Sequence, residues 1–508
     1  MQVNQKKAGV IVSYLAQAVH IITGFIYTPV MIRLLGQSEY GLYQLVYSVV
    51  SYLSLLSLGF GSSYMRFYAR EKSKGNKDGV GKLNGMFLLI FITFSIICII
   101  CGFFMIKNIR AIFGSGLLDA EYSLARILMA LLVINLALTF PNSVFNCIIT
   151  SQERFLFQKT LILIHYILNP VIALPLLIMG FGSIGMVTVT TLLTLAVLIT
   201  NIYYCLVQLK TKFIFHDLQF SLLKEMTAFT FFIFLNQIID QINLSVDKFL
   251  LGRLAGTTSV AVYGVGSQIN SLYSSLSSSV SAVFVPKVNQ LVAKGNRDKE
   301  LTNLFIKVGR IQYIILALIV SGFVFYGKTF IYYWAGSEYG DSYYVALLLM
   351  IPITVPLIQN LGIEIQRAKN KHKARSIVYF IIALANVLIS IPLIKLYGAV
   401  GATIGTAISL VGGNWLFMNW YYQTHLSIDI KLFWKNILSI TRSFVPAIIF
   451  GVICLLFFNK HSIFLMLIEI VLYTIIYAVS VFCFGMVDSE KKEVTSSIRK
   501  IKSALKFN

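Results

Sequence analysis

Charged residues are scarce in this sequence. Only 12% of its 508 residues are Asp, Glu, Lys or Arg, whereas 57% are hydrophobic, and the mean hydropathy is +0.79. Water-soluble domains carry about 25% charged residues, so this composition excludes them. The sequence is therefore that of a polytopic membrane protein.

Acidic residues are scarcer still, with 20 acids against 42 bases and a net charge of +22. Such an excess would suit nucleic acid, but the positions of the bases indicate otherwise. If the N-terminus is cytoplasmic, about 29 bases fall in the tail and the connections of that side and about 7 on the other, which is the positive-inside pattern. We therefore predict two cytoplasmic termini and no nucleic-acid partner.

Residues and motifs that carry chemistry are also few. All six cysteines lie in apolar runs, and we interpret them as small apolar filler rather than as metal ligands or disulfides. No GxxxxGK[ST] loop is present, so ATP use is not expected. The largest connections on the non-cytoplasmic side, 107–123 and 328–341, hold only scattered acids. We predict that the protein is not an enzyme and has no cofactor.

Long apolar runs dominate what is present, and each is long enough to cross about 30 Å of hydrocarbon. All nine prolines lie within them or at their ends, where a proline bends a helix and indicates a mobile bundle. We predict fourteen spans: 9–32, 41–66, 83–106, 124–149, 156–178, 184–207, 226–250, 259–285, 304–327, 342–366, 375–395, 399–421, 437–458 and 462–486.

The sequence contains an internal repeat. RLLGQSEYGLY at 33–43 aligns without a gap on RLAGTTSVAVY at 253–263, and KGNKD at 74–78 aligns on KGNRD at 294–298. Six spans separate the copies, so equivalent helices cross the membrane in the same direction. We predict an N-terminal lobe (1–210), a parallel C-terminal lobe (211–425) and a last part (426–508) with two further helices and a basic tail. In such transporters the cargo passes between the halves by alternating access.

Charged residues inside the spans are candidates for function, because each costs about 2.5–3.5 kcal/mol on insertion scales. The repeat adds an arginine at the outer end of spans one and seven. We predict a cationic chamber for a diphosphate or acidic sugar, lined by Arg33, Arg66, Arg126, Lys248, Arg253 and Arg310. The candidates for coupling to H+ or Na+ are Asp240, Asp247 and Glu364.

Structural explanations of the same residues stay open. Arginines at helix ends snorkel to the interface or cap carbonyls, and some intramembrane charges form ion pairs. Gly36 and Gly256 fit tight helix ends. Serines recur at every third position in spans two and eight, where they serve either close helix packing or a hydroxyl-lined wall for sugars.

Two stretches carry a family resemblance: YTPVMIRLLGQSEYGLYQLVYSVVSYLSLLSLGFGSSYMRFYA and DKFLLGRLAGTTSVAVYGVGSQINSLYSSLSSSVSAVFVPKV. They closely resemble the bacterial polysaccharide-biosynthesis flippases of the multidrug/oligosaccharidyl-lipid/polysaccharide (MOP) exporter superfamily. The resemblance implies an all-α MATE-like fold, with two six-helix lobes in a V and two extra helices. The matching cavity positions are Arg33, Arg66, Asp247, Lys248 and Arg253.

The resemblance also implies a cargo and partners. The cargo is an undecaprenyl-diphosphate-linked oligosaccharide, moved across the bacterial cytoplasmic membrane for surface polysaccharide (O-antigen or capsule) assembly. The expected partners are this lipid-linked oligosaccharide, membrane lipid and polysaccharide polymerase machinery, and the expected state is a monomer. The first span, AGVIVSYLAQAVH, lacks the arginines typical of peptidoglycan-precursor flippases. A multidrug or cation antiporter of the same superfamily and a membrane-embedded polysaccharide polymerase are the alternatives.

Overall fold

The computed structural model describes residues 5–496, apart from 58, 218–219, 296, 370, 372, 458–461, 489 and 493–494. The described residues form helices and turns, with no strand among them. The elements, where η marks a 3-10 or π-helical segment, are α1 (Gln5–Val50), η1 (Ser51–Ser57), α2 (Phe60–Ser73), α3 (Lys77–Lys107), α4 (Ile109–Phe113), α5 (Asp119–Ser151), α6 (Phe155–Ile178), α7 (Gly182–Tyr203), η2 (Tyr204–Gln208), α8 (Phe220–Leu254), α9 (Gly256–Ala293), α10 (Asp298–Trp334), η3 (Ser337–Tyr339), α11 (Ser342–Ile358), α12 (Leu361–Ala368), α13 (Lys373–Leu410), η4 (Val411–Phe417), α14 (Met418–His425), α15 (Ile430–Thr441), η5 (Arg442–Phe444), α16 (Val445–Phe457), α17 (Ile463–Ser480) and η6 (Val481–Gly485).

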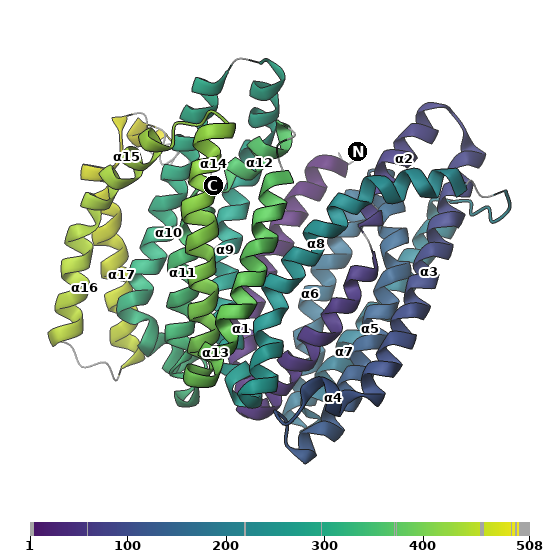
Figure 1. Cartoon of the computed structure of the whole chain (residues 1–508), viewed down its shortest axis with the longest axis horizontal. Helices are drawn as coiled ribbons and strands as arrows, with labels where there is room; N and C mark the ends of the chain where they lie inside the picture. The colour runs from purple at the N-terminus through teal and green to yellow at the C-terminus, as the bar shows by residue number, and fades with distance from the viewer. Residues whose placement is uncertain are drawn as a thin grey trace, which may run out of the picture. The chain divides into compact units, whose positions relative to one another are not determined.

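The helices overlap the predicted apolar runs (Figure 1), but the predicted span 41–66 is divided among the end of α1, η1 and the start of α2. The spans 342–366 and 437–458 are also divided, between α11 and α12 and among α15, η5 and α16. Over the described residues, nine helices are long and apolar enough to cross a membrane, and α11 with α12 would make a tenth span with a 44° bend. That bend follows Pro352 and Pro356 in α11, as expected where a proline removes a backbone hydrogen bond. The protein is thus a multi-pass membrane protein, while the count of fourteen crossings stays a prediction.

Two pairs of predicted spans are joined by a single glycine rather than by a loop. Gly36 inside α1 has φ +71° and Gly398 inside α13 has φ +55°. Both values lie in the left-handed region, which glycine adopts without a steric penalty. Each glycine therefore ends one helix and starts the next at the break that the apolar pattern predicts.

The described residues pack as two compact units. The first runs to Gly264 and includes Val387–Ala402, and the second comprises Val265–Asn386 and the part from Thr403 onward. These units follow packing, whereas the predicted lobes 1–210 and 211–425 follow the sequence repeat. The lobe boundaries therefore stay a prediction.

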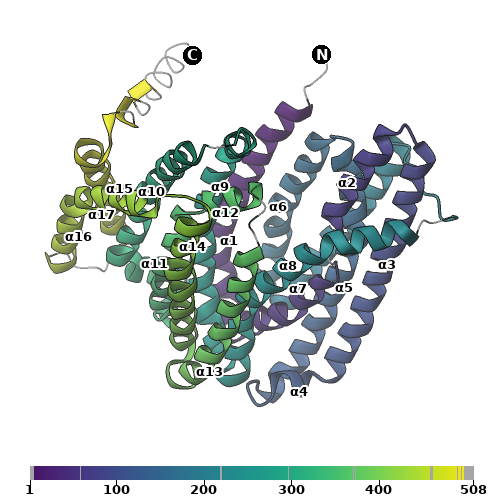
Figure 2. The same ribbon diagram turned by 45° about the horizontal axis from the view of Figure 1, so that its top comes forward.

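In the first unit, α1 packs along α6, and α5 lies between α3 and α7; both ribbon views show α3 beside α5 (Figures 1 and 2). The helix α8 contacts α1, η1 and α2. In the second unit, α10 is the central helix and contacts α11, α15, α16 and α17. Its core includes Phe305 against Phe433, with ring centroids 4.8 Å apart.

Candidate functional site

The two copies of the sequence repeat meet inside the first unit. The first copy supplies α1 beyond Gly36 and η1, and the second supplies the end of α8 and α9 as far as Gly264. We call the contact between these segments the seam. The equivalent glycines Gly36 and Gly256 adopt φ +71° and +82°. The prediction of two tight helix ends is confirmed, and the matching geometry supports the repeat.

Lys248 of α8 lies in the seam. Its Nζ donates a hydrogen bond to Oε1 of Gln44 at 2.9 Å, and Nε2 of Gln44 donates to the hydroxyl of the fully buried Tyr40 at 2.9 Å. The ammonium group is thus held by a neutral amide. A cation in that position is suited to attract an anionic ligand, since lysine binds phosphate as a point charge.

The neighbouring Asp247 is fully buried, with 0% of its surface exposed. Its Oδ2 accepts a hydrogen bond from the hydroxyl of Tyr263 at 2.8 Å. Tyr263 is the repeat equivalent of Tyr43, which is one of the matches that define the repeat. A buried carboxylate requires such donors, because burial without them is costly.

A third group of polar side chains lies one or two turns along α8. Nε2 of Gln241 donates to Oγ of Ser51 at 2.6 Å and to Oγ of Ser245 at 2.7 Å, and the two serine hydroxyls are 3.2 Å apart. Ser51 also donates to the backbone oxygen of Ser48, and Ser54 donates to that of Ser51. Ser51 and Ser54 thus bond to the backbone of their own segment, and Ser51 also bonds across the seam.

Glu121, at the start of α5, closes one end of the seam. Its Oε1 accepts hydrogen bonds from Oγ of Ser38 at 2.5 Å and from Oγ1 of Thr257 at 2.8 Å. Its Oε2 accepts from the backbone N–H of Leu118 at 2.9 Å, which orients the carboxylate. One acid thus joins residues 33–43 and 253–263, which we call the tips of the two repeat copies.

The other predicted cations of this unit are exposed. Arg33, Arg66, Arg126 and Arg253 have exposed side chains, as does the predicted coupling residue Asp240. The guanidinium of Arg253 passes close to Gly114, where a Cβ would lie 3.7 Å from its Nε. Of the predicted residues, the sequence neighbours Asp247 and Lys248 bond across the seam or within it, to Tyr263 and to Gln44.

Arg310, in the second unit, forms a buried ion pair with Glu490, and the two residues are 3% and 8% exposed. Its Nε and Nη2 donate to the two carboxylate oxygens at 2.7 and 2.9 Å. Further bonds reach the backbone oxygens of Asn436 and Gly485 at 3.1 and 2.9 Å. This geometry joins α10 to α15 and to the segment after η6. It does not support the predicted cargo contact of Arg310, which stays a prediction.

The pKa of Glu490 reflects that pairing. Burial by itself raises the pKa, but the hydrogen bonds from Arg310 and from the backbone N–H of Val487 outweigh it and leave the pKa below its ordinary value of 4.5. The predicted coupling residue Glu364 pairs with Arg367 at 2.7 Å. That pair is solvent-accessible and spaced i, i+3 along α12, so it has the form of a surface ion pair.

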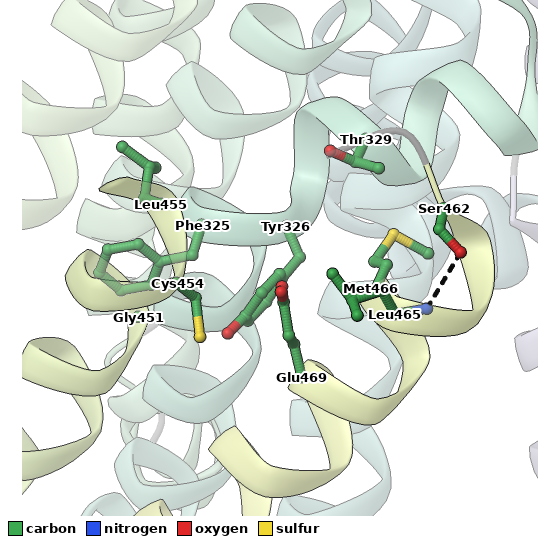
Figure 3. A pocket seen from close by; sticks show the side chains of 10 residues that line it. All are labelled: Phe325, Tyr326, Thr329, Gly451, Cys454, Leu455, Ser462, Leu465, Met466 and Glu469. Carbon is green, nitrogen blue, oxygen red and sulfur yellow. Dashed lines mark hydrogen bonds between the residues drawn. The ribbon is translucent and has the colours of Figure 1, made fainter. Parts of the chain in front are cut away.

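Two cavities lie outside the seam. The first, of about 20 Å³, lies between α10, α16 and α17 (Figure 3). Glu469 and Tyr326 line it, and the Glu469 carboxyl lies beside the tyrosine ring. That volume holds about one water molecule. The second, of about 540 Å³, lies between α6 and α7 and is mostly apolar, with His165 among its lining residues. The first is too small for a sugar, and the second suits hydrocarbon.

Sequence reasoning missed several of these residues. Gln44, Gln241, Glu121 and Glu490 carry the main contacts, yet none belongs to a motif. Gln44 and Tyr263 lie within the two stretches that carry the resemblance, which was the available signal. Over the described residues, no group of three or more His, Cys, Asp or Glu side chains could hold a metal ion.

Comparisons with known proteins place the chain among membrane transporters. Residues 7–292 match the family model described as polysaccharide biosynthesis protein. A protein of Bacillus subtilis (strain 168) called uncharacterized membrane protein EpsK is 23% identical over 422 residues, covering 81% of this chain and 82% of the relative. A putative O-antigen transporter of Shigella flexneri is 19% identical over 407 residues, covering 78% and 92%.

Two solved structures share the fold. The lipid II flippase MurJ in an inward closed conformation has a TM-score of 0.75 at 17% identity, covering 93% of this chain and 98% of that one. A MATE-family multidrug resistance transporter of the MOP superfamily, in an inward-facing conformation, has a TM-score of 0.63 at 16% identity, covering 83% and 99%. The prediction of an all-α membrane fold of the MOP and MATE type is confirmed.

Proposed function

The chain belongs to the polysaccharide biosynthesis protein family, and from that premise we propose that it moves undecaprenyl-diphosphate-linked oligosaccharides across the cytoplasmic membrane by alternating access. Membership, the O-antigen transporter relative and the MurJ-like fold support a flippase of the MOP superfamily for lipid-linked cargo rather than an enzyme. The proposed part is the identity of the cargo, the mechanism and the coupling. The flippase would then supply repeat units for surface polysaccharide assembly.

One observation carries this proposal, namely the position of Lys248. Its ammonium lies in the seam and bonds to the neutral amide of Gln44. A lysine within a membrane span costs about 2.5–3.5 kcal/mol on insertion scales, and an anionic ligand would offset that cost by binding to the ammonium. A diphosphate linked to a polyprenyl chain combines that charge with a hydrophobic part suited to the membrane.

The same observation disfavours the superfamily alternative, a multidrug or cation antiporter. Lys248 would repel an organic cation in the seam, because like charges at close range interact unfavourably in a medium of low dielectric constant. The MATE neighbours share the fold, but fold alone does not determine function. We therefore rank an anionic lipid-linked cargo first.

The proposal includes coupling to H+ or Na+. Among the predicted acids, Asp247 is fully buried next to the cargo-binding Lys248, whereas Asp240 is exposed and Glu364 is paired with Arg367. Asp247 is thus the strongest candidate to carry the coupling ion. We further propose that the protein works as a monomer, with both termini in the cytoplasm and near the polymerase machinery.

The test compares Lys248→Met with Lys328→Met in a strain that lacks the gene. Lys328 is an exposed lysine on α10, so its loss controls for the general removal of a positive charge. We expect the deletion to accumulate lipid-linked repeat units in the inner leaflet, the Lys328 variant to restore transport, and the Lys248 variant to fail at normal membrane abundance.

Two results would contradict this proposal. Full complementation by Lys248→Met would remove the seam lysine from cargo binding. Unchanged glycan with altered tolerance to cationic drugs in the deletion strain would favour the antiporter instead.

A further inference from the structure

The two repeat tips are in backbone contact at the Glu121 end of the seam. A Cβ added at Gly41 would lie 1.9 Å from the carbonyl oxygen of Thr257, and one added at Gly116 would lie 2.0 Å from that of Gly252. No side chain fits at such distances, so glycine is required at both positions. These tips cannot move apart without breaking the bonds that Ser38 and Thr257 make to Glu121.

The carboxylate of Glu121 is well placed to hold this contact. It accepts three hydrogen bonds, one from each repeat tip and one from Leu118, the residue that precedes its own helix. Thr257 is 5% exposed, so its bond is shielded from water. The bonds from Ser38 and Leu118 are exposed, and all three share the strength of hydrogen bonds to a charged acceptor, to which shielding adds at Thr257.

A different contact joins α2, which follows η1, to the start of α8, the helix whose other end lies in the seam. Arg70, near the end of α2, donates to both carboxylate oxygens of Glu225 in the first turns of α8, at 3.0 and 3.1 Å. Their side chains are 37% and 49% exposed. Exposed ion pairs contribute little because water and salt screen them.

We propose that Glu121 is a positioning residue, a latch that keeps its end of the seam closed while the Arg70–Glu225 end opens first. This inference rests on the proposed flippase function, in which each end must open in turn. The unequal strength of the two contacts then sets the resting state. By the positive-inside prediction, the end that opens readily faces the cytoplasm, where the lipid-linked cargo is made available.

Hydrogen–deuterium exchange of the purified full chain in lipid nanodiscs tests the latch without cargo. Thr257→Val removes one donor to Glu121 and keeps the side-chain shape. Its matched control is Ser183→Ala, which removes a hydroxyl that donates to Glu39 at 2.6 Å and joins α7 to α1, away from the second repeat copy. Glu121→Gln serves as a second variant that removes the charge.

We expect Thr257→Val and Glu121→Gln to raise exchange in peptides 37–46 and 256–264 by roughly tenfold, the loss of about one charge-assisted bond. Ser183→Ala should leave peptide 256–264 at the wild-type rate, because its partner Glu39 lies in the other peptide, 37–46. Arg70→Ala should change exchange in 66–73 by less than about threefold. Wild-type exchange in both latch variants, or an equal rise of peptide 256–264 in the Ser183 control, would overturn the latch. A larger effect of Arg70→Ala would overturn the order of opening.

The two proposals fail separately in this design. Exchange is measured on the purified protein, without transport, whereas dependence of the glycan on the gene is measured in cells. Faster exchange in both latch variants, together with a glycan that does not depend on the gene, would support the latch and contradict the proposed cargo. Normal dependence of the glycan on the gene, with unaltered exchange in both latch variants, would contradict the latch alone.

Discussion

Removing the buried carboxylate of Glu490 should destabilise the protein strongly. Glu490→Gln leaves the guanidinium of Arg310, which is 3% exposed, without its counter-charge. Two bonds at 2.7 and 2.9 Å lose their charged acceptor, and breaking one partner of a buried pair costs about 3–5 kcal/mol. The matched control is Glu364→Gln, which breaks the solvent-accessible pair with Arg367 and should cost about 0–1 kcal/mol.

The assay uses the protein's own cysteines. All six are free, and Cys98, Cys205 and Cys454 are buried, so a thiol-reactive dye reports unfolding as the temperature rises. We expect Glu490→Gln to unfold at a clearly lower temperature than both the wild type and Glu364→Gln. An unfolding temperature equal to that of the Glu364 control would refute the structural role of the pair.

Acid adds a second measurement on the same pair. The pKa of Glu490 in the folded protein lies below its ordinary value of 4.5, so the stabilisation is fully present above that value. It is lost as the pH falls through the lower folded pKa, because the carboxylate must then take up a proton. The wild type should therefore lose more stability than Glu490→Gln on acidification below about pH 4.5. Parallel losses in both proteins would contradict this account.

A double variant separates a structural role of Arg310 from cargo binding. Replacing both partners by apolar residues, as Arg310→Met with Glu490→Leu, should recover most of the lost stability, since removal of a whole buried pair is often nearly neutral. If the pair is structural, the recovered protein also restores transport. A stable double variant that fails to complement would show that Arg310 acts on the cargo, as the sequence suggests.

Two further substitutions test the seam. Gly41→Ala would place a Cβ 1.9 Å from the carbonyl oxygen of Thr257, so it should destabilise the tip contact by about 1–3 kcal/mol. The control is Gly24→Ala, on the same helix, because no atom lies within 4 Å of its added Cβ. Equal stability of the two variants in the dye assay would contradict the close contact. Tyr263→Phe removes the 2.8 Å bond to the buried carboxylate of Asp247, so it should lower stability by about 1.5–3 kcal/mol and reduce transport. Wild-type stability and wild-type transport would show that other donors are enough to stabilise the Asp247 carboxylate.

The apolar runs and the repeat are properties that the sequence alone determines. Burial in hydrocarbon requires long apolar helices whatever their neighbours are, so composition was enough to predict the helices and their order. The breaks at Gly36 and Gly398 were also predictable, because only glycine adopts their positive φ angles at no steric cost. The matched tips at 33–43 and 253–263 indicated two equivalent elements before any contact was known.

The partners of individual side chains were decided by tertiary structure. Arg310 and Lys248 look alike in sequence, as single cations within apolar runs, yet one bonds to Glu490, 180 residues away, and the other to Gln44, 204 residues away. Glu121 looks like an ordinary acid in the first turn of a helix until Ser38 and Thr257 are placed beside it. The role of a charged side chain depends on the residues that it contacts on neighbouring helices. The spacing of residues along one helix does not identify those contacts.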